Sequence, residues 1–231
     1  MLKEAAKILT VRFFLPIALL LLVGLAQDWR RLEPISPPPA GMVLVPAGEF
    51  WMGSDDPRAD EESRPLHRVR LPAFYIDRTE VTNRQVRSVK PDFAFPEGRE
   101  DHPATGLTRE QAEQVLSALG KRLPTGAEWE KAARGEDART YPWGEHPPEG
   151  RANVGRIGEH KCASLSLQPV GSYPQGASPY GCLDMIGNAF EWVSDDHPGP
   201  PVRHILRGGA IGYPERYCTT YAVTIEDTGV T

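Results

Sequence analysis

The stretch that decides the fold runs from Lys121 to Gly144 and reads KRLPTGAEWEKAARGEDARTYPWG. Thr125 is followed three residues later by Glu128, which is the pattern of a capping box. In such a box the threonine hydroxyl and the glutamate carboxylate each accept a hydrogen bond from a backbone amide at the start of a helix. Gly135 suits the left-handed conformation that ends a helix. The stretch therefore predicts one short helix from about Thr125 to Gly135.

The end of this stretch predicts a turn, Tyr141-Pro-Trp-Gly144, that carries two aromatic rings. Large rings on a loop usually fill a core or line a cleft. Two further capping boxes, Thr82 with Gln85 and Thr108 with Gln111, predict helices that end near Val89 and at Gly120. The chain is otherwise poor in helix signals.

Alternating apolar residues predict short strands on both sides of the central helix. Gly41 to Phe50 is interpreted as two strands with a tight corner and His67–Leu71 as an edge-type strand, while Ala73–Ile76 is expected to be buried. The C-terminal half is expected to be loop with short strands, at 169–173, 180–181, 186–193 and 204–209. We interpret Asp195-Asp196-His197 as a solvated turn. Short strands with few helices predict an α+β domain.

Charge and composition exclude some classes of protein. The 231 residues contain 26 Lys and Arg against 31 Asp and Glu, for a formal net charge of −5. This balance lacks the basic footprint of a nucleic-acid-binding protein. With 22 Gly and 23 Pro and an ordinary apolar content, the composition indicates a folded domain with abundant loops.

Residues 1–26 have the pattern of a targeting segment. Lys3, Lys7 and Arg12 precede the apolar run from Phe13 to Ala26. The run is shorter than a comfortable spanning helix, so a cleaved signal peptide and a retained N-terminal membrane anchor both remain open. Positive charge before the run places the rest of the chain outside the cytoplasm, in the periplasm or at the cell surface.

Residues 27–40 follow as a Pro-rich linker that contains PISPPP and predicts a semi-rigid spacer. Residues 41–231 then form the folded domain.

Seven motifs, taken in order from Gly41 to the C-terminus, identify a family. They are Met42-Val-Leu-Val-Pro-Ala-Gly-Glu-Phe50 with Met52-Gly53, Pro65 to Leu71 leading into Phe74 to Asn83, Arg122 to Gly135, Tyr141 to Gly144, Asn153 with Pro169-Val170, Tyr180-Gly181 with Asp184 to Trp192, and Arg207-Gly-Gly209. The set resembles the formylglycine-generating enzyme family, also called sulfatase-modifying factors. The resemblance implies a variant of the C-type-lectin-like fold, with a small twisted antiparallel sheet, two to three short helices and much ordered loop.

The resemblance also shows where this chain departs from the enzymes of the family. Those enzymes hold copper with two cysteines five residues apart, and a serine follows the paired glycines. Thiolates suit Cu(I). Here Cys218 occupies the second cysteine position, Tyr213 the first, and Ala210 the serine position. One thiolate and a phenol make a poor copper site, so Cys218 is a catalytic residue only if the chain is an enzyme, and copper is not expected.

Calcium is the cofactor that the resemblance favours. One family site matches Asp184, Gly187, Ala189 and Glu191. Carboxylate and carbonyl oxygens are the hard ligands that Ca²⁺ takes. The alternative is that Glu191 pairs with an arginine and Asp184 caps a turn.

A second family calcium site would begin at Asn153 and Val154. Its aspartate and carbonyl positions fall on His160 and Cys162, where the match to the family weakens.

Other polar residues are assigned structural roles. Glu80, Arg122, Glu128 and Arg134 are expected in buried framework ion pairs. Cys162, Cys182 and Cys218 allow one disulfide and one thiol in an oxidising compartment, and the sequence leaves the pairing open.

The sequence therefore favours a non-catalytic binding or accessory module that engages a protein or peptide partner, attached to or near a membrane protein. Its expected binding surface is formed by Tyr213, Arg216, Tyr217 and Tyr221. Two alternatives remain. One is a divergent oxidase of the formylglycine-generating type that acts on a protein cysteine through Cys218, and the other is a variable ligand-binding receptor on the same fold.

Overall fold

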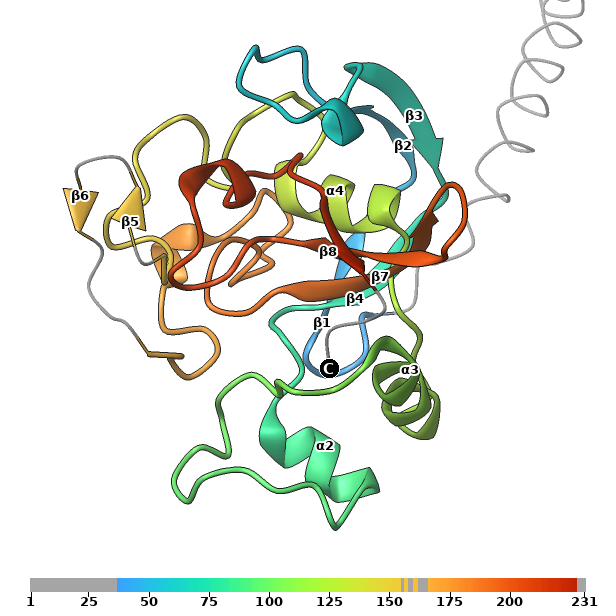
Figure 1. The fold of residues 1–231 in the computed structure, drawn as a ribbon, viewed down its shortest axis with the longest axis vertical. Coiled ribbons are helices and arrows are strands. Elements are labelled where there is room, and N and C mark those ends of the chain that lie inside the picture. Colours follow the sequence, from blue (N-terminus) through green and yellow to red (C-terminus); the bar gives the residue numbers. More distant parts are fainter. Residues whose placement is uncertain (1–36, 155, 158–159, 162–165, 228–231) are drawn as a thin grey trace, which may run out of the picture. The chain divides into compact units, whose positions relative to one another are not determined.

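Helix α4 (Gly126–Arg134) begins at the predicted capping box. Thr125 Oγ1 accepts a hydrogen bond from the amide of Glu128 at 3.1 Å, and the amide of Thr125 donates to Glu128 Oε2 at 2.9 Å. The helix ends at Gly135, whose φ is 76°. Trp129 is fully buried, and the helix lies among the strands near the centre of the ribbon (Figure 1). The predicted helix is confirmed.

The computed structural model describes residues 37–154, 156–157, 160–161 and 166–227. The predicted signal or anchor segment and most of the Pro-rich linker lie outside these residues. Residues 38–231 belong to one unit of the structure. Within the described residues, no helix has the length and apolar character needed to cross a membrane.

The other two capping boxes also start helices. Helix α2 (Asn83–Val89) follows Thr82 and helix α3 (Arg109–Ala118) follows Thr108, each with both reciprocal hydrogen bonds of the box. Both helices lie at one end of the unit, away from α4 (Figure 1). Short 3₁₀ turns complete the helical structure, at Glu61–Ser63, Pro174–Gly176 and Glu215–Tyr217.

The N-terminal strands form a bent ribbon. Strand β1 (Met42–Val45) pairs antiparallel with β4 (Phe74–Asp77), and β2 (Gly48–Met52) pairs antiparallel with β3 (His67–Leu71). The predicted corner between the first two strands is confirmed. Because the chain turns at this corner, the first two strands do not pair with each other and each finds its partner in the returning chain.

The C-terminal strands form a three-stranded antiparallel sheet in the order β7-β8-β9. Its members are β7 (Glu191–His197), β8 (Arg203–Arg207) and β9 (Thr224–Asp227), with an irregularity in the β7–β8 register between Trp192 and Asp196. A separate small pair joins β5 (Arg156–Ile157) to β6 (His160–Lys161).

Several strand predictions in this half are wrong. Residues 169–173 and 180–181 are not strands, and the strand predicted at 186–193 begins only at Glu191. Asp184 and Asn188 have φ values of 58° and 56°, so the chain before Glu191 turns and cannot run extended.

Asp195-Asp196-His197 is likewise part of β7 and not a turn, although Asp195 and Asp196 are exposed to solvent as expected. Asp195 accepts a hydrogen bond from the amide of Gly126, and Asp196 pairs with Arg109 and His204.

Two apolar clusters meet at the segment from 182 to 189. Cys182 and Met185 pack with Trp129, and Ile186 packs with Val154 and Cys218. The predicted aromatic turn supports the second cluster. The Tyr141 and Trp143 rings stack with centroids 5.4 Å apart, and Trp143 packs against the cluster. The segment that carries the candidate cation ligands is therefore anchored on both sides by core packing.

Candidate functional site

Three acidic side chains gather beside the 182–189 segment. Removal from water, with a smaller contribution from the nearby charge of Asp184, raises the pKa of Glu191 to about 7, although the hydrogen bond from Trp129 acts in the opposite direction. Burial likewise raises the pKa of Asp184. Burial raises the pKa of Glu80 well above its usual value, and Glu191 and Asp184 add to that shift. Three mutually repelling carboxylates in a desolvated place favour a cation nearby.

Hydrogen bonds hold each of these carboxylates in place. Glu80 accepts from the Ala189 amide at 3.0 Å and from Asn188 Nδ2 at 2.8 Å. Asp184 Oδ2 accepts from the Gly171 amide at 2.6 Å, and Glu191 Oε2 accepts from Trp129 Nε1 at 2.9 Å. The donors are all neutral, so none of them compensates the negative charge.

No salt bridge within the described residues joins these three acids to Lys, Arg or His. The ion pair expected for Glu80 is therefore wrong, because its two oxygens bond the turn that contains Asn188. The arginine partner considered for Glu191 is not found there either. Asp184 does cap a turn, as the alternative for it proposed, because its carboxylate accepts a hydrogen bond from the backbone amide of Gly171.

The donor chemistry fits a calcium ion. No group of three His, Cys, Asp or Glu side chains in the described part of the chain converges to hold a metal. The predicted set therefore depends on backbone oxygens as well as side chains. It comprises the carboxylates of Asp184 and Glu191 and the carbonyls of Gly187 and Ala189. Such a mixture of carboxylates and carbonyls at loop spacing is what Ca²⁺ binds.

The second predicted cation site contains an unsatisfied oxygen. Asn153 is 2 % exposed, and its Nδ2 donates to Asn188 Oδ1 at 2.8 Å and to Ser166 O at 3.1 Å. Its Oδ1 is buried and finds no hydrogen-bond partner. A buried amide oxygen without a donor fits a cation ligand. Val154 is fully buried beside it, while Cys162 and the side chain of His160 lie outside the described residues.

Tyr213 and Cys218 lie in different environments. Tyr213 is 48 % exposed, whereas Cys218 is fully buried and packs in the second apolar cluster. Its Sγ lies 2.8 Å from the point where a side chain on Gly209 would begin, so only glycine fits there. The residue at the first copper-ligand position therefore faces solvent while the second lies in the core.

The expected binding surface is only partly correct. The Tyr213 ring meets Phe190 edge-on at 4.6 Å and Tyr217 at 6.2 Å, and the Arg216 guanidinium lies 4.6 Å from the Tyr217 ring. Tyr221 does not belong to this surface. It is 5 % exposed, because the chain turns into the core at Cys218.

A cavity of about 1060 Å³ extends from two of these carboxylates, Glu80 and Glu191, to the exposed Tyr213. Its walls include β4, helix α3 and the face of the C-terminal sheet that carries Trp192, Leu206 and Thr224. Glu80 and Glu191 also line it, as do Phe190 and Tyr213. Of the four residues predicted to form a binding surface, Tyr213 is the one that lines this cavity.

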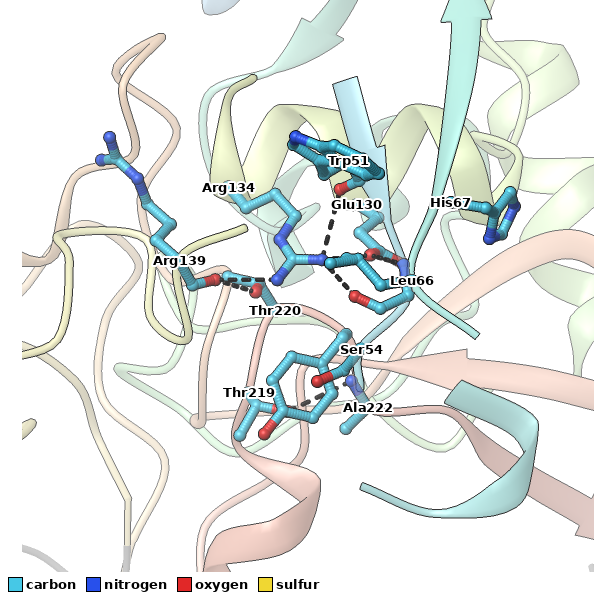
Figure 2. A network of polar contacts seen from close by, with 12 residues as sticks. Trp51, Ser54, Leu66, His67, Glu130, Arg134, Arg139, Thr219, Thr220 and Ala222 are labelled. Atoms are coloured by element: carbon cyan, nitrogen blue, oxygen red, sulfur yellow. Dashed lines mark hydrogen bonds and ion pairs between the residues drawn. The ribbon is translucent and has the colours of Figure 1, made fainter. Parts of the chain in front are cut away.

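A buried ionic network ties the ends of the domain to α4. Arg134 Nη1 donates to Glu130 Oε1 at 2.8 Å and to Gly53 O at 2.6 Å. Figure 2 shows the Arg134 guanidinium beside Glu130 on one side and the backbone of Arg139, next to Thr220, on the other. Arg207 bonds the other oxygen of Glu130 at 3.0 Å.

The buried framework pair expected for Arg134 is confirmed, because Arg134 pairs with Glu130 and both side chains are 1 % exposed. Arg122 and Glu128 also pair, through two 2.7 Å hydrogen bonds, but the Arg122 side chain is 67 % exposed, so this pair is not buried as expected. The sequence analysis did not predict Glu130 or Arg207 as members of this network. Each residue lies within one of the seven family motifs, and that position was the only signal in the sequence.

One of the three cysteines, Cys182, has a protonated and unpaired thiol. Cys182 is a free thiol in the core, and burial raises its pKa to about 12. It forms no disulfide with Cys218, and Cys162 lies outside the described residues.

Comparison with known proteins agrees with this architecture. Residues 31–228 match the sulfatase-modifying factor enzyme 1-like domain. The chain is 33 % identical over 197 residues to hercynine oxygenase of Mycolicibacterium smegmatis, covering 66 % of this chain and 45 % of the oxygenase. It is 29 % identical over 261 residues to the formylglycine-generating enzyme of Bos taurus, covering 80 % of this chain and 69 % of the enzyme.

A solved structure gives the same fold. Treponema denticola variable protein 1 superposes with a TM-score of 0.66 at 21 % identity, covering 82 % of this chain and 90 % of that protein. The chain thus spans less than half the length of the hercynine oxygenase, 69 % of the formylglycine-generating enzyme and 90 % of the variable protein.

Proposed function

Because this chain belongs to the sulfatase-modifying factor enzyme 1-like family, we propose that it is an extracytoplasmic, calcium-stabilised binding module for a peptide segment of a protein partner. Two of its relatives bear the names of enzymes, and their activities belong to those proteins. The proposal for this chain rests on its own residues Tyr213 and Cys218, which occupy the two copper-ligand positions of the family's enzymes.

The observation that carries the proposal is the separation of Tyr213 from Cys218. A copper-thiolate oxidase needs two soft ligands that meet at one metal ion. Here one position is an exposed phenol packed on Phe190 and the other is a thiol enclosed in the core. An exposed tyrosine cluster beside a large cavity instead supports recognition of a ligand.

The cavity favours an extended peptide as its occupant. Apolar walls of this extent are costly to leave exposed to water, so a ligand with apolar side chains gains from entering. In the described part of the chain, β9 pairs only with β8 and β1 only with β4. Residues of all four strands line the cavity. Unpaired strand edges beside an apolar groove suit the addition of a peptide strand.

The N-terminal sequence supports the location outside the cytoplasm. A segment with positive charge before an apolar run is exported or inserted in that orientation. The Pro-rich linker would hold the domain close to the membrane if the segment is retained, and therefore close to a membrane protein partner. A C-terminal fusion to alkaline phosphatase, which is active only after export, tests this orientation. An inactive fusion with normal expression would contradict it.

Peptide binding is tested by selection from a displayed peptide library on the full chain. We expect enrichment of apolar peptides, with affinity at least tenfold weaker for Tyr213→Ala. Val202→Ala is the matched control, since Val202 is 55 % exposed and does not line the cavity. Failure to enrich any peptide, or equal losses in both variants, would contradict the proposal.

A divergent oxidase is the rival function, supported by Cys218 at one copper-ligand position and by the enzymes among the relatives. It predicts oxygen-dependent loss of thiol from a cysteine-containing peptide in the presence of copper, abolished by Cys218→Ser. Thiol loss at the same rate with and without Cys218 would exclude that mechanism.

A further inference from the structure

Residues 107–119 form a strap beside the cavity, and helix α3 makes up most of this strap. The strap begins after Gly106 and ends before Gly120, whose φ values of 77° and 71° are left-handed conformations that glycine adopts without strain. A side chain at either glycine would meet no atom within 4 Å beyond its chain neighbours. The two glycines therefore serve the backbone and not the packing, and each gives the strap a point of rotation.

The chain just outside the strap is fixed on both sides. On the N-terminal side, the amide of Ala104 donates to Val81 O at 2.9 Å. On the C-terminal side, Lys121 Nζ donates to the two carboxylate oxygens of Asp77, the last residue of β4, at 2.7 and 2.8 Å. Rotation at the two glycines can therefore move the strap while the chain on either side stays in place.

The apolar face of α3 covers the cavity instead of packing into the core. Ala112, Val115 and Leu116 all line the cavity. Among the described residues, neither of the two apolar clusters includes a residue of α3, and no backbone hydrogen bond joins this helix to another element. Opening the strap would therefore leave the core packing of the domain intact, as is typical of a segment with low local stability.

A latch centred on one arginine holds the strap against the C-terminal sheet. Arg109 is the first residue of α3, and its side chain is only 11 % exposed. Its Nη2 donates to Ser194 O at 2.6 Å, and its Nη1 pairs with Asp196 and lies 2.8 Å from His204 Nδ1. These three partners belong to β7 and β8. The latch thus joins the start of α3 to the two strands by polar contacts alone.

A second polar contact lies beside the latch. Trp192 Nε1 donates to Leu107 O at 3.2 Å, and the Trp192 ring meets the His204 ring edge-on with centroids 6.0 Å apart. Both Trp192 and Leu107 line the cavity. The contacts that close the strap therefore lie at the edge of the cavity, where their loss would open a way in.

From this geometry we propose that residues 107–119 are a hinged strap that lifts from the C-terminal sheet to admit the peptide and then closes over it. The inference rests on the proposed peptide-binding function. Val115 and Leu116 are buried while the strap is closed, and opening exposes them to water. An apolar peptide in the cavity covers them again, so closure over the peptide recovers the apolar burial. Arg109 is the positioning residue that sets how often the strap opens.

Hydrogen exchange of the full chain, measured by mass spectrometry, tests the opening without any ligand. Arg109→Gln removes the charge of the latch. It should raise the exchange rate of the α3 amides about tenfold or more, because hydrogen bonds to charged groups are among the stronger ones. The amides of α4 should keep their wild-type rates. Arg84→Gln is the matched control, since it removes an arginine from an exposed ion pair on the neighbouring helix α2.

Association kinetics test whether the opening admits the peptide. The probe is the most enriched peptide of the library selection, labelled with fluorescein. It should associate with Arg109→Gln about tenfold faster than with the wild-type chain, because opening precedes entry, and with Arg84→Gln at the wild-type rate. Asp196→Asn removes the carboxylate of the latch, whose side chain is 47 % exposed, and should act in the same direction. This variant keeps the test decisive if Arg109→Gln does not fold.

The outcomes separate the strap from the function beneath it. Faster α3 exchange together with faster association, in a latch variant and not in Arg84→Gln, supports the strap. Unchanged α3 exchange, equal acceleration in α3 and α4, or unchanged association would overturn it and leave peptide binding intact. Failure to enrich any peptide would overturn the proposed function and the admission of a peptide with it, and the α3 exchange rates would still show whether the strap opens.

Discussion

At the scale of single residues, Glu130 links the most distant parts of the domain. It is 1 % exposed and lies between two buried arginines, Arg134 and Arg207. Arg134 also bonds the carbonyls of Trp51 and Gly53, and Arg207 bonds those of Tyr221 and Ala222. One carboxylate thus pairs with both of the arginines that hold the N-terminal ribbon and the C-terminal segment.

Glu130→Gln should therefore destabilise the protein strongly. Removing one partner of a buried ionic network leaves uncompensated charge and costs about 3–5 kcal/mol. Urea unfolding of the full chain measures this loss. Glu113→Gln, which removes an ion pair whose glutamate side chain is 47 % exposed, is the control and should change stability by about 1 kcal/mol or less. Equal losses in both variants would contradict the assigned role of Glu130.

Cys182 should be unreactive in the folded protein. Its pKa of about 12 keeps it protonated between pH 7 and pH 9, and only the thiolate is a nucleophile. Alkylation by iodoacetamide, followed by mass spectrometry of the peptide, should show no gain over this pH range until urea is added. Rapid labelling of native Cys182 would show that the core opens locally.

At the scale of the element, helix α4 depends on the ends that its own sequence encodes. Glu128 closes the capping box and also pairs with Arg122. The hydrogen bonds from Arg122 contribute most to a pKa for Glu128 below its usual value, and the cap amide contributes as well. The charged form of Glu128 is therefore the form that stabilises the helix.

The pH dependence of stability follows from that shift. Because the pKa of Glu128 is lower in the folded state, its contribution is complete above the unfolded value of about 4.5 and is lost as pH falls through the folded value. Glu128→Gln should remove this part of the acid-side loss, measured as unfolding free energy between pH 6 and pH 3. The exposed Glu97→Gln is the control. A variant that keeps the full wild-type slope would contradict the assignment.

At the scale of the whole molecule, calcium should stabilise the fold. An ion that binds only the folded state at 100 times its dissociation constant adds about 2.7 kcal/mol. We expect a chelator to lower the Tm of the wild-type chain, and Asp184→Asn to remove most of this effect. Asp101→Asn, at an exposed ion pair with Arg84, should keep the full response. A wild-type Tm that does not respond to calcium or chelator would exclude a stabilising ion.

Much of the local structure was predictable because its signals lie close together in the chain. Each capping box joins residues three apart, so Thr82, Thr108 and Thr125 marked the helix starts correctly. The strand predictions after Gly144 were less successful. Left-handed turns at Asp184 and Asn188 interrupt apolar residues that would otherwise suit a strand, and no glycine marks these two positions.

The sequence by itself determined the family, the fold class, the helix ends and the residue types of the first candidate cation site. Only the tertiary structure decided which distant groups meet. Glu80 reaches Asn188 across 108 positions and Asn153 reaches it across 35, and the cavity joins strands from both ends of the domain. Local hydrogen bonding encodes caps and turns within a few residues, whereas contacts between remote residues depend on how the whole chain buries its apolar surface.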